Sequence, residues 1–217
     1  MTLASLVQRA RRLTEGRHRA VLGIAGSPGS GKSTLAAALL AALGATALGA
    51  ATAHVPMDGF HLADVELARL GRLARKGAPD TFDVGGYVAL LRRIRADAEE
   101  MIYAPAFERT LEQPLAGAVG VPRSARLVLT EGNYLLLDEP GWREVRAELD
   151  EVWFCDPHPA VRRERLVARH TAFGKSPADA AAWVAAVDDP NAARVEQTRD
   201  HADLVIPGAV LEQLGPP

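Results

Sequence analysis

The sequence predicts an α/β fold in which a parallel five-stranded sheet is covered by helices on both faces. Short apolar runs alternate with longer helical patterns along the whole chain, the rhythm of parallel sheets joined by helical crossovers. The first apolar run also leads through a glycine-rich turn directly into an alanine- and leucine-rich helical pattern. The 217 residues, 48% of them hydrophobic, carry no repeat or linker. We therefore predict one domain over residues 1–217.

Five apolar runs are the predicted strands. Each is short, rich in Val, Leu, Ile or Ala, and bounded by polar residues, Gly or Pro, as expected for strands buried on both faces. They are Ala20–Ala25, Ala53–Met57, Leu127–Thr130, Val152–Cys155 and Leu204–Ile206.

Helical patterns fill most of the gaps between these strands. Two have clear start signals: Asp83 is a predicted N-cap, and Ser176 is an N-cap followed by proline at the first helical position. The predicted helices are an amphipathic, basic one within Thr2–Arg19, then Ser33–Leu43, Val84–Met101, Trp142–Leu149, Ala160–Phe173, Pro177–Val187 and Ala192–His201.

Two segments depart from this rhythm. Tyr103–Val121 has two β-like pieces around a polar, proline-containing centre, which predicts a hairpin-like excursion from the core over residues 101–121 or so. Gly71–Asp80 is a second, irregular insertion. Open α/β sheets bind ligands at loops beyond the carboxyl ends of their strands, so the hairpin is a predicted substrate insertion.

The glycine-rich turn Gly26–Thr34 reads G-S-P-G-S-G-K-S-T and fits the phosphate-binding pattern G-x-x-x-x-G-K-[ST]. Its strand–loop–helix context is the one that this motif requires. Glycines let several backbone N–H groups point at one phosphate, and the helix N-terminus adds its dipole. The sequence therefore predicts a P-loop NTPase fold that binds a nucleoside triphosphate. The predicted binding residues are Gly26, Ser27, Gly29, Ser30, Gly31, Lys32, Ser33 and Thr34, with Lys32 on the β/γ-phosphates and Ser33 on Mg²⁺.

Two acids follow predicted strands and are candidates for chemistry. Asp58 lies in M-D-G-F-H, where a carboxylate can orient a hydroxyl and accept its proton. Glu131 ends an apolar strand in the Walker B layout and is, with Ser33, a predicted Mg²⁺ ligand. Their neighbours Phe60, His61, Asn133 and Tyr134 are predicted to line the same cleft, although His61 could equally be structural.

Arginines mark a predicted lid over residues 160–176 or so. Arg162, Arg165 and Arg169 share one helical face, and Gly174-Lys175 follows as a flexible break. Guanidinium groups on a closing lid neutralise charge on a transferred phosphoryl group and exclude water. We predict that Arg165 and Arg169 take part in catalysis; an ordinary solvated helix face is the alternative.

The sequence lacks the motifs that mark several other classes of protein. The guanine-reading Asn/Thr-Lys-x-Asp sequence, the L-S-G-G-Q signature and the G-x-S-x-G elbow are missing, and no His/Cys cluster has zinc spacing. The net charge of −2 gives no general attraction to nucleic acid or membrane, and no apolar run approaches the roughly 20 residues of a membrane span. The single cysteine, Cys155, lies in an apolar run and suits a reducing cytoplasm.

Taken in order, these motifs resemble the P-loop kinases that include uridine kinase, type I pantothenate kinase and phosphoribulokinase. The chain is similar above all to bacterial proteins of the nucleoside/nucleotide kinase family, some labelled fructose-transport kinases. The segments that carry the resemblance are G-S-P-G-S-G-K-S-T, M-D-G-F-H, P-D-T-F-D-V-G-G-Y, Y-A-P-A-F-E-R, T-E-G-N-Y-L-L-L and R-R-E-R-L-V-A-R-H-T-A-F-G-K-S, which lie between Val21 and Ile206.

The resemblance implies roles for further residues. Asp58 matches the catalytic base, Lys32 and Ser33 the phosphate and Mg²⁺ residues, Glu131 the second acid, and Arg165 and Arg169 the lid arginines. Asp83, Tyr87, Phe107 and Arg109 fall where relatives build the acceptor pocket, and Asn191 and Arg199 where some relatives contact adenine. The hairpin differs from that of these relatives. The histidine of uridine and pantothenate kinases is missing from the corresponding segment, Ala106-Phe107-Glu108-Arg109.

The sequence thus predicts a cytoplasmic kinase that uses ATP and Mg²⁺ to phosphorylate a hydroxyl of a small metabolite, such as a nucleoside, a pantothenate-like molecule or a sugar. A regulatory P-loop ATPase acting on a protein partner is the alternative, and a nucleic-acid end kinase is less favoured because no basic, aromatic tract is present. The sequence leaves open whether the chain forms a homodimer.

Overall fold

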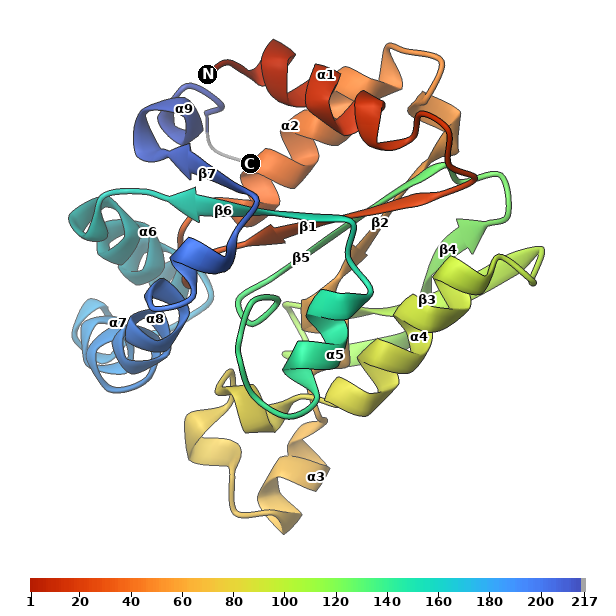
Figure 1. Cartoon of the computed structure of the whole chain (residues 1–217). Helices are drawn as coiled ribbons and strands as arrows, with labels where there is room; N and C mark the ends of the chain where they lie inside the picture. The colour runs from red at the N-terminus through yellow and green to blue at the C-terminus, as the bar shows by residue number, and fades with distance from the viewer. Residues whose placement is uncertain (216–217) are drawn as a thin grey trace.

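A computed structural model describes residues 1–215 of the chain. It contains a five-stranded parallel sheet in the order β2-β5-β1-β6-β7, flanked by helices, so the predicted fold class is confirmed (Figure 1). β1 pairs with β5 on one side and β6 on the other, which places the phosphate-loop strand at the centre. The strands are β1 (Ala20–Ala25), β2 (Thr52–Pro56), β5 (Leu127–Gly132), β6 (Glu151–Asp156) and β7 (Leu204–Pro207).

Two apolar clusters cover the two faces of the sheet. Leu22 and Ile24 of β1 face a cluster shared with α1 (Leu3–Leu13), α2 (Lys32–Gly44) and α9 (Gly208–Glu212). Val21 and Ala25 face the opposite cluster, because side chains alternate along a strand. That cluster includes residues of α4 (Val84–Ala96), α5 (Trp142–Ala147) and α8 (Asp189–Glu196).

The predicted hairpin forms a separate two-stranded sheet of β3 (Met101–Glu108) and β4 (Gln113–Pro122). Its base is closed, since Met101 pairs with Pro122. The hairpin lies against the 3-10 turn Met57–Phe60, and a Cβ at Gly59 would stand only 2.3 Å from the carbonyl oxygen of Pro105. A residue without a side chain is therefore needed where these two backbones meet.

Several predicted helix boundaries differ from the structure, three of them by more than two residues. The helix from Val84 was expected to reach Met101 but ends at Ala96, because Asp97 takes a left-handed conformation (φ 51°) that stops it. The pattern Pro177–Val187 divides into α7 (Pro177–Trp183) and a π-helical turn, Val184–Asp188, and the last pattern starts earlier and ends at Glu196. The two N-caps are confirmed, since Asp83 and Ser176 each accept a hydrogen bond from a backbone N–H of the first helical turn.

The remaining elements are α3 (Asp64–Arg69) with the short turns of the Gly71–Asp80 insertion, and α6 (Pro159–Ala172), the predicted lid helix. Within residues 1–215 no helix has the length and apolar character that crossing a membrane requires.

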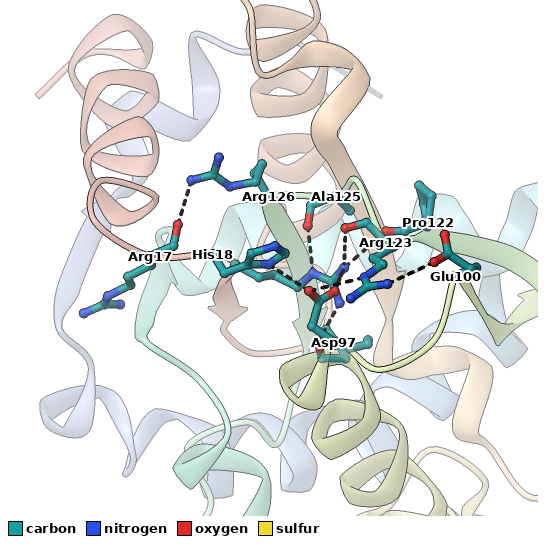
Figure 2. Close-up of polar contacts among 10 residues, drawn as sticks. Arg17, His18, Asp97, Glu100, Pro122, Arg123, Ala125 and Arg126 are labelled. Atoms are coloured by element: carbon teal, nitrogen blue, oxygen red, sulfur yellow. Dashed lines mark hydrogen bonds and ion pairs between the residues drawn. The ribbon is translucent and has the colours of Figure 1, made fainter.

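A buried arginine joins three segments next to the start of β1. The Arg19 guanidinium donates to the carbonyl oxygens of Ile94, Pro122, Arg123 and Ala125 at 2.6–3.3 Å and pairs with Asp97 at 2.8 Å. Figure 2 shows Asp97 between His18 and Arg123, and Arg126 reaching the carbonyl of Arg17. With only 4% of its side chain exposed, Arg19 holds the end of α4 and the base of the hairpin against the start of β1.

Candidate active site

A cavity of about 730 Å³ lies beyond the carboxyl ends of β1, β2 and β5. Seven segments contribute to its walls: the phosphate loop, the turn after β2, the start of α3, the Gly71–Asp80 insertion, the hairpin, the end of β5, and the helices from α6 to α8. Of the residues that the sequence singled out, it brings together Gly29, Lys32, Ser33, Asp58, His61, Phe107, Arg109, Glu131, Asn133, Arg169 and Asn191.

The phosphate loop takes its shape from its glycines. Gly31 is the N-cap of α2 with φ 93°, a conformation that residues with side chains rarely adopt. Gly29, at φ 77°, packs against α6 so closely that a Cβ would lie 2.8 Å from the Arg162 carbonyl oxygen. The loop therefore exposes backbone N–H groups at the start of a helix, where a phosphate binds well.

Lys32 is held by three oxygen atoms. Its ammonium donates to the carbonyls of Gly26 at 2.9 Å and Ser27 at 3.0 Å, and to Oδ1 of Asn133 at 2.7 Å. Burial lowers the pKa of Lys32, an effect that the negative charge of Glu131 opposes. The ammonium is thus fixed at the floor of the cavity, with its hydrogen bonds satisfied by groups that a phosphate oxygen could replace.

Ser33 and Glu131 meet next to Lys32. The Ser33 hydroxyl donates to Oε1 of Glu131 at 3.0 Å, which links the phosphate loop to the end of β5. Burial raises the pKa of Glu131, and the nearby charge of Asp58 raises it further. A hydroxyl and a carboxylate are hard oxygen ligands of the kind that Mg²⁺ takes beside phosphates and water, so this pair fits a magnesium ion.

Asp58 faces the hairpin across the cavity. Its carboxylate lies 3.8 Å from a guanidinium nitrogen of Arg109, and its carbonyl oxygen is 2.8 Å from Nδ1 of His61. The His61 ring lies 4.0 Å from that of Phe82 and 4.8 Å from that of Phe107 (centroid to centroid). Burial lowers the pKa of His61, so it lies in this wall as a mainly neutral ring.

The three arginines predicted to share one face of α6 point to different partners. Arg169 lines the cavity, where burial lowers its pKa and Arg109 adds repulsion. Arg165 reaches over the phosphate loop, with Nη1 3.4 Å from a Cβ built at Gly31. Arg162, expected on the same face, instead pairs with Asp189 of α8 at 2.7 Å and is buried. The lid helix is therefore anchored at one end and presents Arg165 and Arg169 near the phosphate loop.

Several predicted site residues do not line the cavity. Phe60, Tyr87 and Tyr134 are buried in the core; the Tyr87 hydroxyl pairs with that of Thr130. Asp83 is the exposed N-cap of α4, and Arg199 pairs with Asp156 at 3.0 Å. Gly26, Ser27, Ser30 and Thr34 belong to the phosphate loop or the first turn of α2 without lining the cavity, and Ser27 donates to Glu196 at 3.3 Å.

Sequence reasoning missed cavity residues on the insertion, at the end of the lid helix and after the lid. Lys76 donates to Oδ1 of Asp64 at 2.6 Å and lies 5.4 Å from the Phe107 ring centroid. Its rarity, one of three lysines, was the available signal. Phe173 and Trp183 also line the cavity, as does Asp188, which pairs with His170 at 2.8 Å. Nothing in the local sequence pattern marks these three positions, because the lid fold alone brings them there.

Comparisons with known proteins agree with this geometry. A solved structure from Silicibacter sp. TM1040, described as a "putative fructose transport system kinase", is 40% identical, has a TM-score of 0.87 and covers 95% of this chain and 100% of that one. The "Putative uridine kinase C227.14" of Schizosaccharomyces pombe is 34% identical over 173 residues, 78% of this chain and 74% of that protein. The "ATP-dependent kinase-like protein notR'" of Aspergillus versicolor is 33% identical over 161 residues, 70% of this chain and 94% of that protein.

No protein-family model matches the chain. The relatives nevertheless align along most of their own length, and the Silicibacter structure shares the fold described above. The chain belongs to the family of ATP-dependent P-loop kinases that includes uridine kinase and pantothenate kinase.

Proposed function

We propose that this kinase transfers the γ-phosphoryl group of ATP to a hydroxyl group of a small metabolite. The observation that carries the proposal is the meeting of Lys32, Ser33, Glu131 and Asp58 on one cavity that continues between the hairpin and the lid. Such a cavity gives an acceptor room beside the phosphates, which an ATPase acting on a protein partner does not need.

Lys32 and the phosphate loop bind the triphosphate. On ATP binding, the Lys32 ammonium exchanges its contacts with Gly26, Ser27 and Asn133 for phosphate oxygens. The backbone N–H groups at the start of α2 donate hydrogen bonds to the other phosphate oxygens. Ser33 and Glu131 would hold Mg²⁺, which supplies charge neutralisation on the phosphates when bound.

Asp58 acts on the acceptor. Its carboxylate orients the acceptor hydroxyl and takes its proton as the oxygen forms a bond to the γ-phosphorus. The bond from the γ-phosphorus to the bridging oxygen breaks, and ADP leaves with that electron pair. Arg165 and Arg169 stabilise the charge on the phosphoryl group during its transfer and exclude water from it.

The test is ADP release from ATP and Mg²⁺ against a panel of uridine, pantothenate, ribulose 5-phosphate, fructose and other sugars. The variant is Asp58→Asn, and its matched control is Asp64→Asn, a second aspartate of the same cavity that instead pairs with Lys76. We expect one acceptor to raise ADP release, and Asp58→Asn to lower that turnover by roughly 10²–10⁴-fold. The control should keep turnover within about tenfold, since Asp64 contributes binding surface without proton transfer.

ADP release that no acceptor stimulates, together with a stable protein complex, would instead support a regulatory ATPase. Full activity of Asp58→Asn would remove this carboxylate from the proposed mechanism.

A further inference from the structure

Arg162 is a buried arginine that the proposed transfer reaction does not use. Only 6% of its side chain is exposed, although it lies on the same helix, α6, as Arg165 and Arg169. Burying a guanidinium removes its hydration, so partners within the protein must offset that loss. The partners of Arg162 come from two other parts of the chain, the phosphate loop and α8.

The guanidinium of Arg162 joins the phosphate loop to α8. Its Nη2 donates to Oδ1 of Asp189, the first residue of α8, at 2.7 Å, and its Nη1 donates to the carbonyl oxygen of Pro28 at 3.4 Å. The loop also packs on the backbone of α6, where Gly29 leaves no room for a Cβ next to the Arg162 carbonyl. A change in the shape of the loop therefore acts on both the backbone and the side chain of Arg162.

A second link from the loop to α8 passes through Glu196. Its Oε1, at the end of α8, accepts a hydrogen bond from the Ser27 hydroxyl at 3.3 Å and lies 3.9 Å from Nε of Arg162. Within residues 1–215 this Nε is buried and makes no hydrogen bond. Two donors thus face one carboxylate oxygen, and the donor from the loop is the one bonded to it. When a phosphate draws Ser27 away, an approach of about 1 Å lets Oε1 bond to the unsatisfied Nε.

We propose that Arg162 is a positioning residue that couples phosphate binding in the loop to the packing of the lid helix on α8. Phosphate in the loop tightens the contacts of Arg162 with Asp189 and Glu196. Because Arg162 belongs to α6, the same contacts hold Arg165 and Arg169 over the loop. The inference rests on the proposed function, in which these two arginines stabilise the transferred group. Arg162 touches no reacting atom and acts only through them.

Arg163 provides a matched control. It follows Arg162 on α6 and also pairs with Asp189, at 2.7 Å, but 56% of its side chain is exposed. Among the described residues Asp189 is its one ion-pair partner, so it has the same charge and the same partner without the link to the loop. The variants are Arg162→Lys and Arg163→Lys, each of which keeps a positive charge near Asp189 and loses the planar fork of the guanidinium.

The experiment follows hydrogen exchange in α8 when inorganic tripolyphosphate and Mg²⁺ bind. Tripolyphosphate occupies the phosphate loop without an adenine ring that could contact α8, and calorimetry shows when the protein is saturated. We expect the amides of α8 to exchange about tenfold more slowly at saturation in the wild type and in Arg163→Lys, and to stay unchanged in Arg162→Lys. Arg162→Lys should also bind tripolyphosphate about tenfold more weakly, because the Pro28 carbonyl has lost its charged donor.

Glu196→Ala tests the same coupling from the side of α8. The Glu196 side chain is 49% exposed, so its loss should leave the fold intact. The substitution removes the oxygen that Ser27 and Arg162 share, and it should reduce the protection of α8 by tripolyphosphate about threefold. Glu164→Ala is its control, since Glu164 is an exposed glutamate on α6, and should keep the wild-type response.

Two results would overturn the inference. One is wild-type protein in which the exchange of α8 does not respond to tripolyphosphate, whether or not tripolyphosphate binds. The other is wild-type protection of α8 in Arg162→Lys or in Glu196→Ala, since the substituted residue would then serve only the stability of the fold.

Failure of the proposed function looks different. The response of α8 to tripolyphosphate would then persist, while no alcohol in the turnover panel raised ADP release above background. Where an acceptor does raise it, Arg162→Lys should lower kcat about tenfold at saturating ATP, because Arg165 and Arg169 are misplaced, and Arg163→Lys should leave kcat within about twofold.

Discussion

Replacing Gly59 by alanine tests whether the hairpin sets the geometry of the reaction. Gly59 follows Asp58, and a Cβ there would lie 2.3 Å from the carbonyl oxygen of Pro105, where ordinary contacts begin at 3.4 Å. The φ angle of Gly59 lies outside the left-handed region, so what opposes alanine is the contact with the backbone of Pro105 and Ala106. The hairpin and the Asp58 turn must therefore separate by about 1 Å.

A shift of that size displaces Phe107 and Arg109 relative to Asp58, all of which line the cavity. Misplacement of reacting groups by about 1 Å can lower a rate by about 10²-fold, which is the loss in kcat/KM for the acceptor that we expect. ATP binding should remain near the wild-type value, because the added Cβ meets the hairpin backbone at Pro105 and Ala106, outside the phosphate loop.

The assay is acceptor-stimulated ADP release, with ATP affinity measured by calorimetry and hydrogen exchange followed over the hairpin. Gly44→Ala is the matched control: it lies at the end of α2, no atom is within 4 Å of its added Cβ, and it should leave both constants unchanged. Wild-type kcat/KM in Gly59→Ala would refute the reasoning, since the hairpin position would then not matter to transfer.

Three further perturbations test separate parts of the structure. Arg19→Ala leaves four carbonyls and Asp97 without their buried partner, so it should lower the free energy of unfolding, measured in urea, by about 3–5 kcal/mol. Arg123 is half exposed, so Arg123→Ala should lower the same free energy by less than about 1 kcal/mol. Burial raises the pKa of Cys155 to about 12, so the thiol stays protonated at pH 8. It should react with Ellman's reagent only after the protein unfolds, and rapid reaction of the folded protein would contradict its burial. Lys32→Ala removes the ammonium from the cavity floor and should weaken ATP binding about ten- to hundredfold by calorimetry; unchanged affinity would mean that the loop does not bind the triphosphate.

The central strands of the sheet were predictable because they are buried on both faces and appear as continuous apolar runs, such as Leu127–Val128–Leu129. The phosphate loop was predictable because its residue types are required by its backbone conformation. The end of α4 was not predictable, because it depends on Asp97 taking a left-handed conformation within a run of good helix formers. Local propensity cannot anticipate a boundary that Arg19, far along the chain, helps to fix.

The candidate site was predictable where residues follow directly from strands, as Asp58 and Glu131 do. It was less predictable on the lid, where helical spacing placed Arg162 with Arg165 and Arg169, but an ion pair with Asp189 turns it away. Nor does spacing tell whether a tyrosine faces a ligand or the core, as Tyr87 shows. Such outcomes depend on contacts between segments that are distant in sequence.

The closed base of the hairpin has a consequence for how this kinase can diversify. Because Met101 and Pro122 are paired, the chain leaves the sheet and returns to it at a single point. Insertions, deletions or wholesale exchange between these two residues would leave the register of the five parallel strands intact. The residues that bind ATP and the hairpin residues that we propose contact the acceptor can therefore change separately, provided that the close approach of Pro105 to Gly59 is kept.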